Sequence, residues 1–270
     1  MKKKIKLCKM IIVIVLCFAG CESNDDNNLR PIQNQFLVDK VYDYNNNLLA
    51  EYFYNENNQL IMRKDTDPVN NKSSDYEFEY ENNRVSRIIY TDYSFPQFSH
   101  STKIYYNMKG KMIKAETFKN GNLVGSKNYV YYPDGKMKGL IDDNDLEYVT
   151  LFYNSTENVE QVKLLGSGNS LPEDGGQTED RYFDYEYDNA LKPYFGINDM
   201  LPFEPLPYFG NEATFAKNIS QSNMTKNVES GTKWVYQYNE FNLPETIEVV
   251  WYNVETYEPM LWRIRYRAIE

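Results

Sequence analysis

The chain has 270 residues, of which 16% are aromatic and 25% charged, and it carries a net charge of −10. So acidic a composition argues against nucleic acid as a partner, because binding to a phosphate backbone needs clustered positive charge. The three cysteines all lie within the first 21 residues, so we expect the rest of the chain to be stabilised by packing rather than by disulfides.

The N-terminal segment has the pattern of a secretory signal peptide. Five lysines precede an apolar run from Met10 to Ala19, which is roughly half the length of ~20 residues that a membrane-spanning helix needs. The run ends in Phe18-Ala19-Gly20-Cys21, which resembles the lipobox of bacterial lipoproteins. We therefore predict a signal peptide over residues 1–20 and lipidation of Cys21. Ordinary secretory cleavage that leaves Cys21 unmodified is the alternative.

The segment after Cys21 is polar and acidic. Residues 22–28 hold one Glu, two Asp and three Asn but no large apolar side chain, so residues 21–34 are predicted to be a flexible tether. This stretch resembles the acidic export signal that follows the lipidated cysteine in lipoproteins of the Bacteroidota. The resemblance implies a protein anchored by lipid on the outer face of the outer membrane.

The stretch over residues 76–88 shows how the body of the chain is built. Tyr76, Phe78 and Tyr80 alternate with Glu77 and Glu79, which in an extended chain sends the rings to one face and the carboxylates to the other. The asparagines at 82 and 83 suit a tight turn, and an apolar pattern resumes after them. The stretch predicts two antiparallel strands joined by a turn.

Copies of this unit recur along the chain. Tyr54, Tyr80, Tyr106 and Tyr132 are each 26 residues apart, and a fixed period of this size indicates repetition of one supersecondary unit. At about 3.3 Å per residue, such a unit holds two strands and two turns. We therefore predict an all-β protein, an antiparallel meander of repeated hairpins that forms a single domain over residues 35–270.

Residues 191–228 interrupt the pattern. Four prolines stand among aromatic residues in this segment, and prolines at that density exclude a central strand. The segment is predicted to be an irregular insertion that packs across the sheet, with a short helix near residues 211–216. Residues 234–239, 246–253 and 261–268 are predicted to be the last three strands.

The repeats resemble a known group of sequences. Tyr106-Asn107, followed by Gly110 and Met112, is similar to the YD repeats of Rhs-type proteins, and Asp134-Gly135 begins a stretch that resembles MORN-type hairpins. Together with the signal and tether, these features resemble a family of Bacteroidota lipoproteins of unassigned function. The resemblance supplies no catalytic residue, and the repeats are too few for the hollow shell of large Rhs toxins.

Few residues suggest catalysis or metal binding. His100 is the only histidine, and we interpret it as an exposed loop residue rather than part of a catalytic triad. The acidic turn over residues 142–147 has oxygen ligands for Ca²⁺ but lacks the glycine and the spacing of a calcium loop, so a solvated turn is favoured. We expect no metal and no other cofactor.

The aromatic alternation leaves one alternative open. A flat aromatic face can stack on sugar rings, whereas a sheet also needs one buried face, and burial is favoured for most of these rings. All three tryptophans lie near the C-terminus, which makes that end the first candidate for a ligand surface. The candidate ligand-binding residues are Trp234, Tyr236, Tyr238, Trp251 and Trp262.

The leading hypothesis is a non-enzymatic binding or structural-interaction module that engages a glycan or a protein at the cell surface. The alternative is a carboxylate-dependent hydrolase such as a glycoside hydrolase, since carboxylates are plentiful in so acidic a chain. An enzyme would show a concave pocket with converging carboxylates, whereas a binding sheet would show an exposed aromatic strip.

Overall fold

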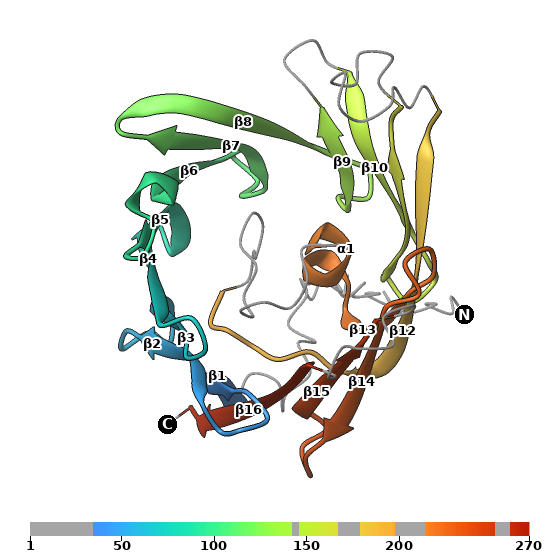
Figure 1. The fold of residues 1–270 in the computed structure, drawn as a ribbon. Coiled ribbons are helices and arrows are strands. Elements are labelled where there is room, and N and C mark those ends of the chain that lie inside the picture. Colours follow the sequence, from blue (N-terminus) through green and yellow to red (C-terminus); the bar gives the residue numbers. More distant parts are fainter. Residues whose placement is uncertain (1–34, 142–145, 167–178, 198–213, 252–259, 270) are drawn as a thin grey trace, which may run out of the picture.

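The computed structural model describes residues 35–141, 146–166, 179–197, 214–251 and 260–269, which form sixteen antiparallel strands closed into a barrel (Figure 1). The predicted antiparallel meander is confirmed, and its closure into a barrel was not predicted. The strands are β1 (Phe36–Tyr42), β2 (Leu48–Tyr54), β3 (Leu60–Asp67), β4 (Lys72–Glu81), β5 (Arg84–Asp92), β6 (His100–Tyr106), β7 (Met112–Lys119), β8 (Asn122–Tyr131), β9 (Met137–Ile141), β10 (Glu147–Tyr153), β11 (Val159–Leu164), β12 (Arg181–Leu191), β13 (Ser222–Asn227), β14 (Lys233–Tyr238), β15 (Pro244–Val250) and β16 (Met260–Ala268).

The β4–β5 hairpin forms as its alternation predicts. Asn82 and Asn83 have φ angles of 51° and 62°, a left-handed pair that matches the twist of a two-residue hairpin turn. Phe78 is buried and packs in the core, whereas Glu77 and Glu79 on the other face are exposed. The rings therefore point into the barrel and the carboxylates point out of it.

The outward faces of several strands carry ion pairs. Lys40 of β1 contacts Glu51 of β2 at 2.7 Å, and Lys226 of β13 contacts Glu186 of β12 at 2.8 Å. Both pairs join residues that are opposite each other in the sheet. Exposed pairs of this kind add at most about 1 kcal/mol each, but they show that these parts of the wall face water.

A recurrent turn explains the Tyr-Asn dipeptides. In the turn from Asn107 to Lys111, the Asn107 side-chain oxygen accepts hydrogen bonds from the backbone N–H groups of Lys109 and Lys111, both at 3.0 Å. The fourth residue, Gly110, is left-handed with φ 77°. The asparagine thus fixes the turn with its own side chain. The same arrangement occurs in turns 55–59, 154–158 and 239–243.

A tyrosine on each even-numbered strand joins that strand to the preceding one. Its hydroxyl donates to a backbone carbonyl that lies beside a β-bulge, over distances of 2.6 to 2.8 Å. Near these carbonyls the sheet ladder between neighbouring hairpins has stopped, for example at Arg87 and Lys103 between β5 and β6. The hydroxyl therefore replaces missing ladder bonds. The pairs are Tyr54–Val38, Tyr80–Leu60, Tyr106–Val85, Tyr131–Met112, Tyr153–Met137, Tyr187–Val159, Tyr236–Met224 and Tyr266–Pro244.

The two ends of the described chain form the last repeat of this series. β16 pairs with β1 and carries Tyr266, while β1 carries the bulge at Val38 and accepts the bond from Tyr54. The Ile269 N–H donates to the Gln35 carbonyl at 2.8 Å. β16 and β1 thus form a hairpin without a connecting turn, and the tyrosine bonds run around the whole barrel as a closed ring.

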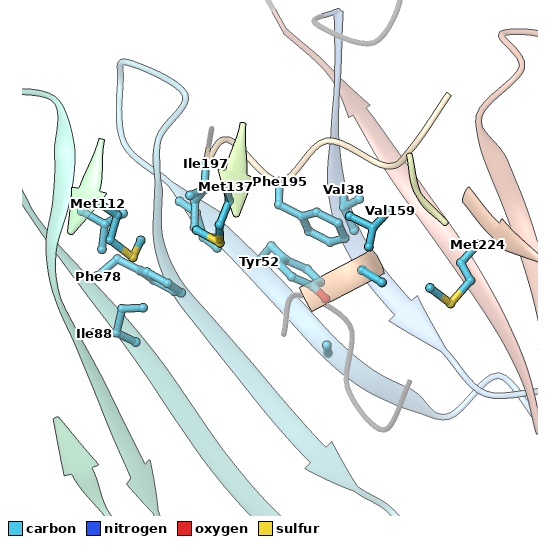
Figure 2. Close-up of a cluster of buried hydrophobic side chains, with 14 of the residues drawn as sticks. Val38, Tyr52, Phe78, Ile88, Met112, Met137, Val159, Phe195, Ile197 and Met224 are labelled. Atoms are coloured by element: carbon cyan, nitrogen blue, oxygen red, sulfur yellow. The ribbon is translucent and has the colours of Figure 1, made fainter. Parts of the chain in front are cut away.

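The described parts of the insertion lie inside the barrel and are called the plug: residues 192–197 and 214–221, which include helix α1 (Thr214–Ile219) (Figure 1). Phe195 packs on Tyr52 with ring centroids 5.4 Å apart, and Ile197 belongs to the same buried cluster (Figure 2). The Lys192 ammonium donates to the Ser220 carbonyl at 2.9 Å and to the last carbonyls of α1, which caps that helix.

Two details of the sequence prediction are wrong. The 26-residue spacing predicts Tyr132 as the tyrosine equivalent to Tyr106 in the next hairpin, but the equivalent residue is Tyr131, which donates to Met112. The Tyr132 hydroxyl donates instead to the Leu151 carbonyl of β10. Strand β13 also falls within residues 191–228, which were predicted to lack strands; the part of this range that holds the strand has no proline. The predicted signal peptide and tether lie outside the described residues.

Candidate functional site

A cavity of about 760 Å³ lies between the barrel wall and the plug, and we call it the inner cavity. It lies toward the end of the barrel that holds the turns after β2, β4 and β6, since all three turns contribute to its lining. Its volume is in the range of small-molecule sites. The described lining consists of Asn57, Asn58, Gln59, Tyr80, Asn82, Asn83, Arg84, Val85, Tyr106, Gly110, Lys111, Tyr131 and Met137 from the wall, and Tyr194, Gly196, Ile197, Asn218 and Ile219 from the plug.

Four tyrosines give the inner cavity an aromatic lining. The hydroxyls of Tyr80, Tyr106 and Tyr131 donate to backbone carbonyls as part of the closed series of tyrosine bonds around the barrel. These three side chains are therefore held in fixed positions. Burial raises the pKa of Tyr80 and of Tyr194, which keeps both phenols neutral. Together with the asparagine amides, this lining combines flat apolar surface with polar groups, the combination that suits a sugar ring.

Two cations complete the lining. The Arg84 guanidinium carbon lies 5.5 Å from the centre of the Tyr106 ring, and the Lys111 ammonium lies 5.2 Å from the centre of the Tyr131 ring. The Lys111 ammonium also donates to the Gly135 carbonyl. Arg84 crosses directly over Gly110, where a Cβ atom would overlap the guanidinium. The glycine therefore lets this cation reach the cavity.

Carboxylates are absent from the described lining of the inner cavity. The chain as a whole has 39 acidic residues against 29 basic ones, so a described lining with two cations and no acid departs from the average surface. The described lining is therefore suited to bind neutral or anionic groups, and it holds no carboxylate pair for acid–base chemistry.

A second hollow of about 1060 Å³, the outer groove, follows the gap between β5 and β6. These strands pair only from Arg87 to Tyr90 and from His100 to Lys103. The groove shares Asn82, Arg84 and Tyr106 with the inner cavity, so Arg84 stands where the two hollows meet. Its described lining includes acids as well as cations, with Glu79, Glu81, Arg87 and Lys103 among them.

The residues predicted as a ligand surface lie mainly in the core. Trp234 and Trp262 are each 3% exposed, and Trp251 is partly buried against the same cluster. The Tyr236 hydroxyl donates to the Met224 carbonyl as part of the closed series of tyrosine bonds, and the Tyr238 hydroxyl donates to Asp188. The alternative of burial therefore holds for Trp234 and Trp262. None of the five is among the described residues that line the inner cavity.

His100 is the first residue of β6 rather than a loop residue, and it is partly exposed. Its Nδ1 lies 2.9 Å from the Phe98 carbonyl, and its ring packs on Tyr90 with centroids 5.2 Å apart. The nearby Ser99 hydroxyl accepts from the backbone of Asp92, and the Ser101 hydroxyl accepts from Arg87. These partners explain the local polar groups as structural contacts.

The predicted acidic turn is described only in part, because residues 142–145 lie outside the described residues. Glu147 contacts the Lys138 ammonium at 2.5 Å and accepts from the Thr150 hydroxyl. These donors lower the pKa of Glu147 against the opposing effect of burial. Within the described ranges, no group of three or more metal-ligating side chains is present, and no helix is long and apolar enough to cross a membrane.

Comparisons with known proteins give similarities of fold only. No protein-family model and no curated protein matches the chain. A porin-like protein from Bacteroides uniformis is 13% identical over 81% of this chain and 90% of its own, with a TM-score of 0.48. The TcdB2-TccC3-Cdc42 structure is 12% identical over 79% of this chain, which spans 10% of that chain, with a TM-score of 0.29. Such scores carry no functional argument, and the predicted lipoprotein family stays a prediction.

Sequence reasoning missed Arg84 and Lys111. Both residues directly follow a left-handed turn residue, Asn83 and Gly110 respectively, and the repeat therefore contains a signal for them. That signal has meaning only once the turns are known to surround a cavity.

Proposed function

We propose that this protein is a non-enzymatic binding module that takes a glycan into the inner cavity. The observation that carries the proposal is the lining of that cavity, which combines four tyrosines, three of them held by hydroxyl hydrogen bonds, with asparagine amides. Rings supply apolar contact to the flat face of a sugar, and amides both donate and accept hydrogen bonds to hydroxyl groups.

The alternative of a carboxylate-dependent hydrolase has less support. Glycoside hydrolysis needs two carboxyl groups that flank the scissile bond, and the described lining of the inner cavity has none. Glu79 and Glu81 line the outer groove, but both are exposed residues of β4 and neither is among the described residues that line the inner cavity.

The glycan proposal is tested with a glycan array and a variant that fills the cavity. Asn57 lines the inner cavity as the third residue of its turn, whereas Lys109 has the same position in the β6–β7 turn and is not among the lining residues. We expect Asn57→Trp to abolish glycan binding and Lys109→Trp to preserve it. Both variants should melt like the wild type. Equal binding by the two variants, or no binding by the wild type, would contradict the proposal.

We further propose that the barrel is held at the outer membrane by a lipid on Cys21 rather than by a lipid-facing wall. A membrane-spanning barrel carries an apolar outer band, whereas ion pairs such as Lys40–Glu51 and Lys226–Glu186 stand on the outward faces here.

Replacing Cys21 with Ala tests the anchor. The variant should move from the membrane fraction to the soluble fraction of the cell envelope. The substitution removes the site of the lipid, which is the attachment to the membrane in this proposal. The wild type is the control, and its electrophoretic mobility should also differ by the lipid. A Cys21→Ala variant that still sediments with membranes would refute lipid anchoring.

A further inference from the structure

The residue that follows each left-handed turn residue has an equivalent position in the repeat. In the turns at the end of the barrel where the inner cavity lies, the last left-handed residues are Asn58, Asn83, Gly110, Gly135, Glu157 and Asn242. Each is followed by the residue that leads into an odd-numbered strand. The residues at this repeat position are Gln59, Arg84, Lys111, Lys136, Asn158 and Leu243.

Three consecutive hairpins place a cation at this position, and each cation lies over the tyrosine of the next hairpin. The distances from the charged group to the ring centre are 5.5 Å for Arg84, 5.2 Å for Lys111 and 5.7 Å for Lys136. Gln59, Asn158 and Leu243 occupy the same position without a charge, and their hairpins form the same fold. The fold therefore does not require a cation at this position.

The three cations differ in their surroundings. Lys136 contacts the carboxylates of Glu157 at 3.3 Å and Asp134 at 3.9 Å, and it is not among the residues that line the inner cavity. Arg84 and Lys111 do line it, and the contacts described for them are with tyrosine rings and a backbone carbonyl. Among the described residues neither of these two forms an ion pair, although Arg84 also borders the outer groove that Glu79 and Glu81 line.

We propose that the inner cavity selects an acidic glycan, whose carboxylate, sulfate or phosphate group binds between Arg84 and Lys111. This inference rests on the proposed function, since it assigns a charge to the ligand of that cavity. Guanidinium and ammonium groups are strong donors to anionic oxygens, and the rings of Tyr106 and Tyr131 lie beside these two cations. The sugar would then lie on the tyrosine lining.

The test compares variants on an array that contains each acidic glycan beside its neutral parent. Arg84→Gln and Lys111→Gln introduce the residue that the repeat itself uses at position 59, so we expect both to fold. Each should weaken binding of acidic glycans about tenfold to a hundredfold, the effect of losing one charged hydrogen bond. Lys136→Gln changes the same repeat position outside the cavity and should bind like the wild type. Added salt should weaken the wild-type interaction.

The possible outcomes separate the two proposals. Preference for acidic glycans that is lost in Arg84→Gln and Lys111→Gln but kept in Lys136→Gln supports the acidic ligand. Equal binding of acidic and neutral forms, or equal loss in all three variants, overturns the acidic ligand while glycan binding stands. Binding of neither form overturns glycan binding itself. Circular dichroism and thermal melting of each variant establish that a loss of binding is not a loss of folding.

Discussion

Deleting residues 260–270 should abolish the cooperative unfolding transition. This segment contains β16, which pairs with β15 on one side and with β1 on the other, so its loss opens two ladders at once. Trp262 and Ile264, 3% and 5% exposed, leave the core with it, and burial of each such side chain is worth about 1.5–3 kcal/mol. The bond from Tyr266 to Pro244 is also lost. The sum is comparable to the whole stability of a typical domain.

Differential scanning calorimetry and size-exclusion chromatography measure this effect. We expect a truncated chain without a sharp transition that associates through the exposed edges of β1 and β15. A truncated chain that melts as sharply and at the same temperature as the wild type would show that closure by β16 is not required.

A circular permutant is the matched control for this deletion. Because Ile269 bonds to Gln35, the two ends can be joined with a copy of the Asn107–Lys111 turn, and the chain can be opened between Asn120 and Gly121 in the turn after β7. All sixteen strands are then kept, but the order of the chain changes. We expect the permutant to fold with a melting temperature within a few degrees of the wild type, since the β16–β1 pair already has the form of a hairpin.

The hairpins could be predicted from sequence because their signals are local. Alternation around Phe78 and the left-handed preference of Asn82 and Asn83 lie within a dozen residues of one another, and each favours the same structure. Closure of the barrel is different, since it depends on pairing between Phe36 and Ala268 at opposite ends of the described chain. No local pattern determines whether a meander stays open or closes.

The candidate site was harder to predict for the same reason. Tryptophans were expected at a ligand surface because aromatic rings bind sugars, but alternation cannot tell which face of a strand meets solvent once both faces carry rings. Trp234 and Trp262 point into the barrel, where the plug and neighbouring strands cover them. Conversely, Arg84 and Lys111 resemble ordinary surface cations in sequence. Their place at a cavity depends on the insertion, whose position inside the barrel leaves no periodic signal.

Raising the pH above about 10 should unfold the protein, because the buried tyrosines whose hydroxyls join neighbouring hairpins then ionise. Burial is the main cause that raises the pKa of Tyr54, Tyr187 and Tyr266 above the ordinary value of 10.0. Because the folded state holds these phenolic protons more tightly than the unfolded state, their contribution to stability is complete below pH 10 and is lost as the pH rises further. Each such group lowers the free energy of unfolding by about 1.4 kcal/mol per pH unit, so these three lower it by about 4 kcal/mol per unit.

Absorbance at 295 nm and circular dichroism, recorded together against pH, measure this effect. The buried tyrosines should ionise together with the loss of the β-sheet signal. If all tyrosines ionise while the β-sheet signal is kept, the hydroxyls that join neighbouring hairpins are accessible to solvent, which would contradict this prediction.

Two Tyr→Phe substitutions on β12 separate the loss of the Tyr187 hydroxyl bond from the general effect of removing a tyrosine hydroxyl. Tyr187→Phe keeps the ring but leaves the Val159 carbonyl without the donor that lies 2.7 Å away, and we expect a loss of about 1–3 kcal/mol at pH 7. It should also lessen the decline of stability above pH 10, because one buried phenol no longer ionises. Tyr182→Phe alters an exposed residue of the same strand and should leave the stability at pH 7 unchanged. If the two variants have equal stability at pH 7, the ring hydroxyls do not hold neighbouring hairpins together, and the barrel must be held by its ladders and core alone.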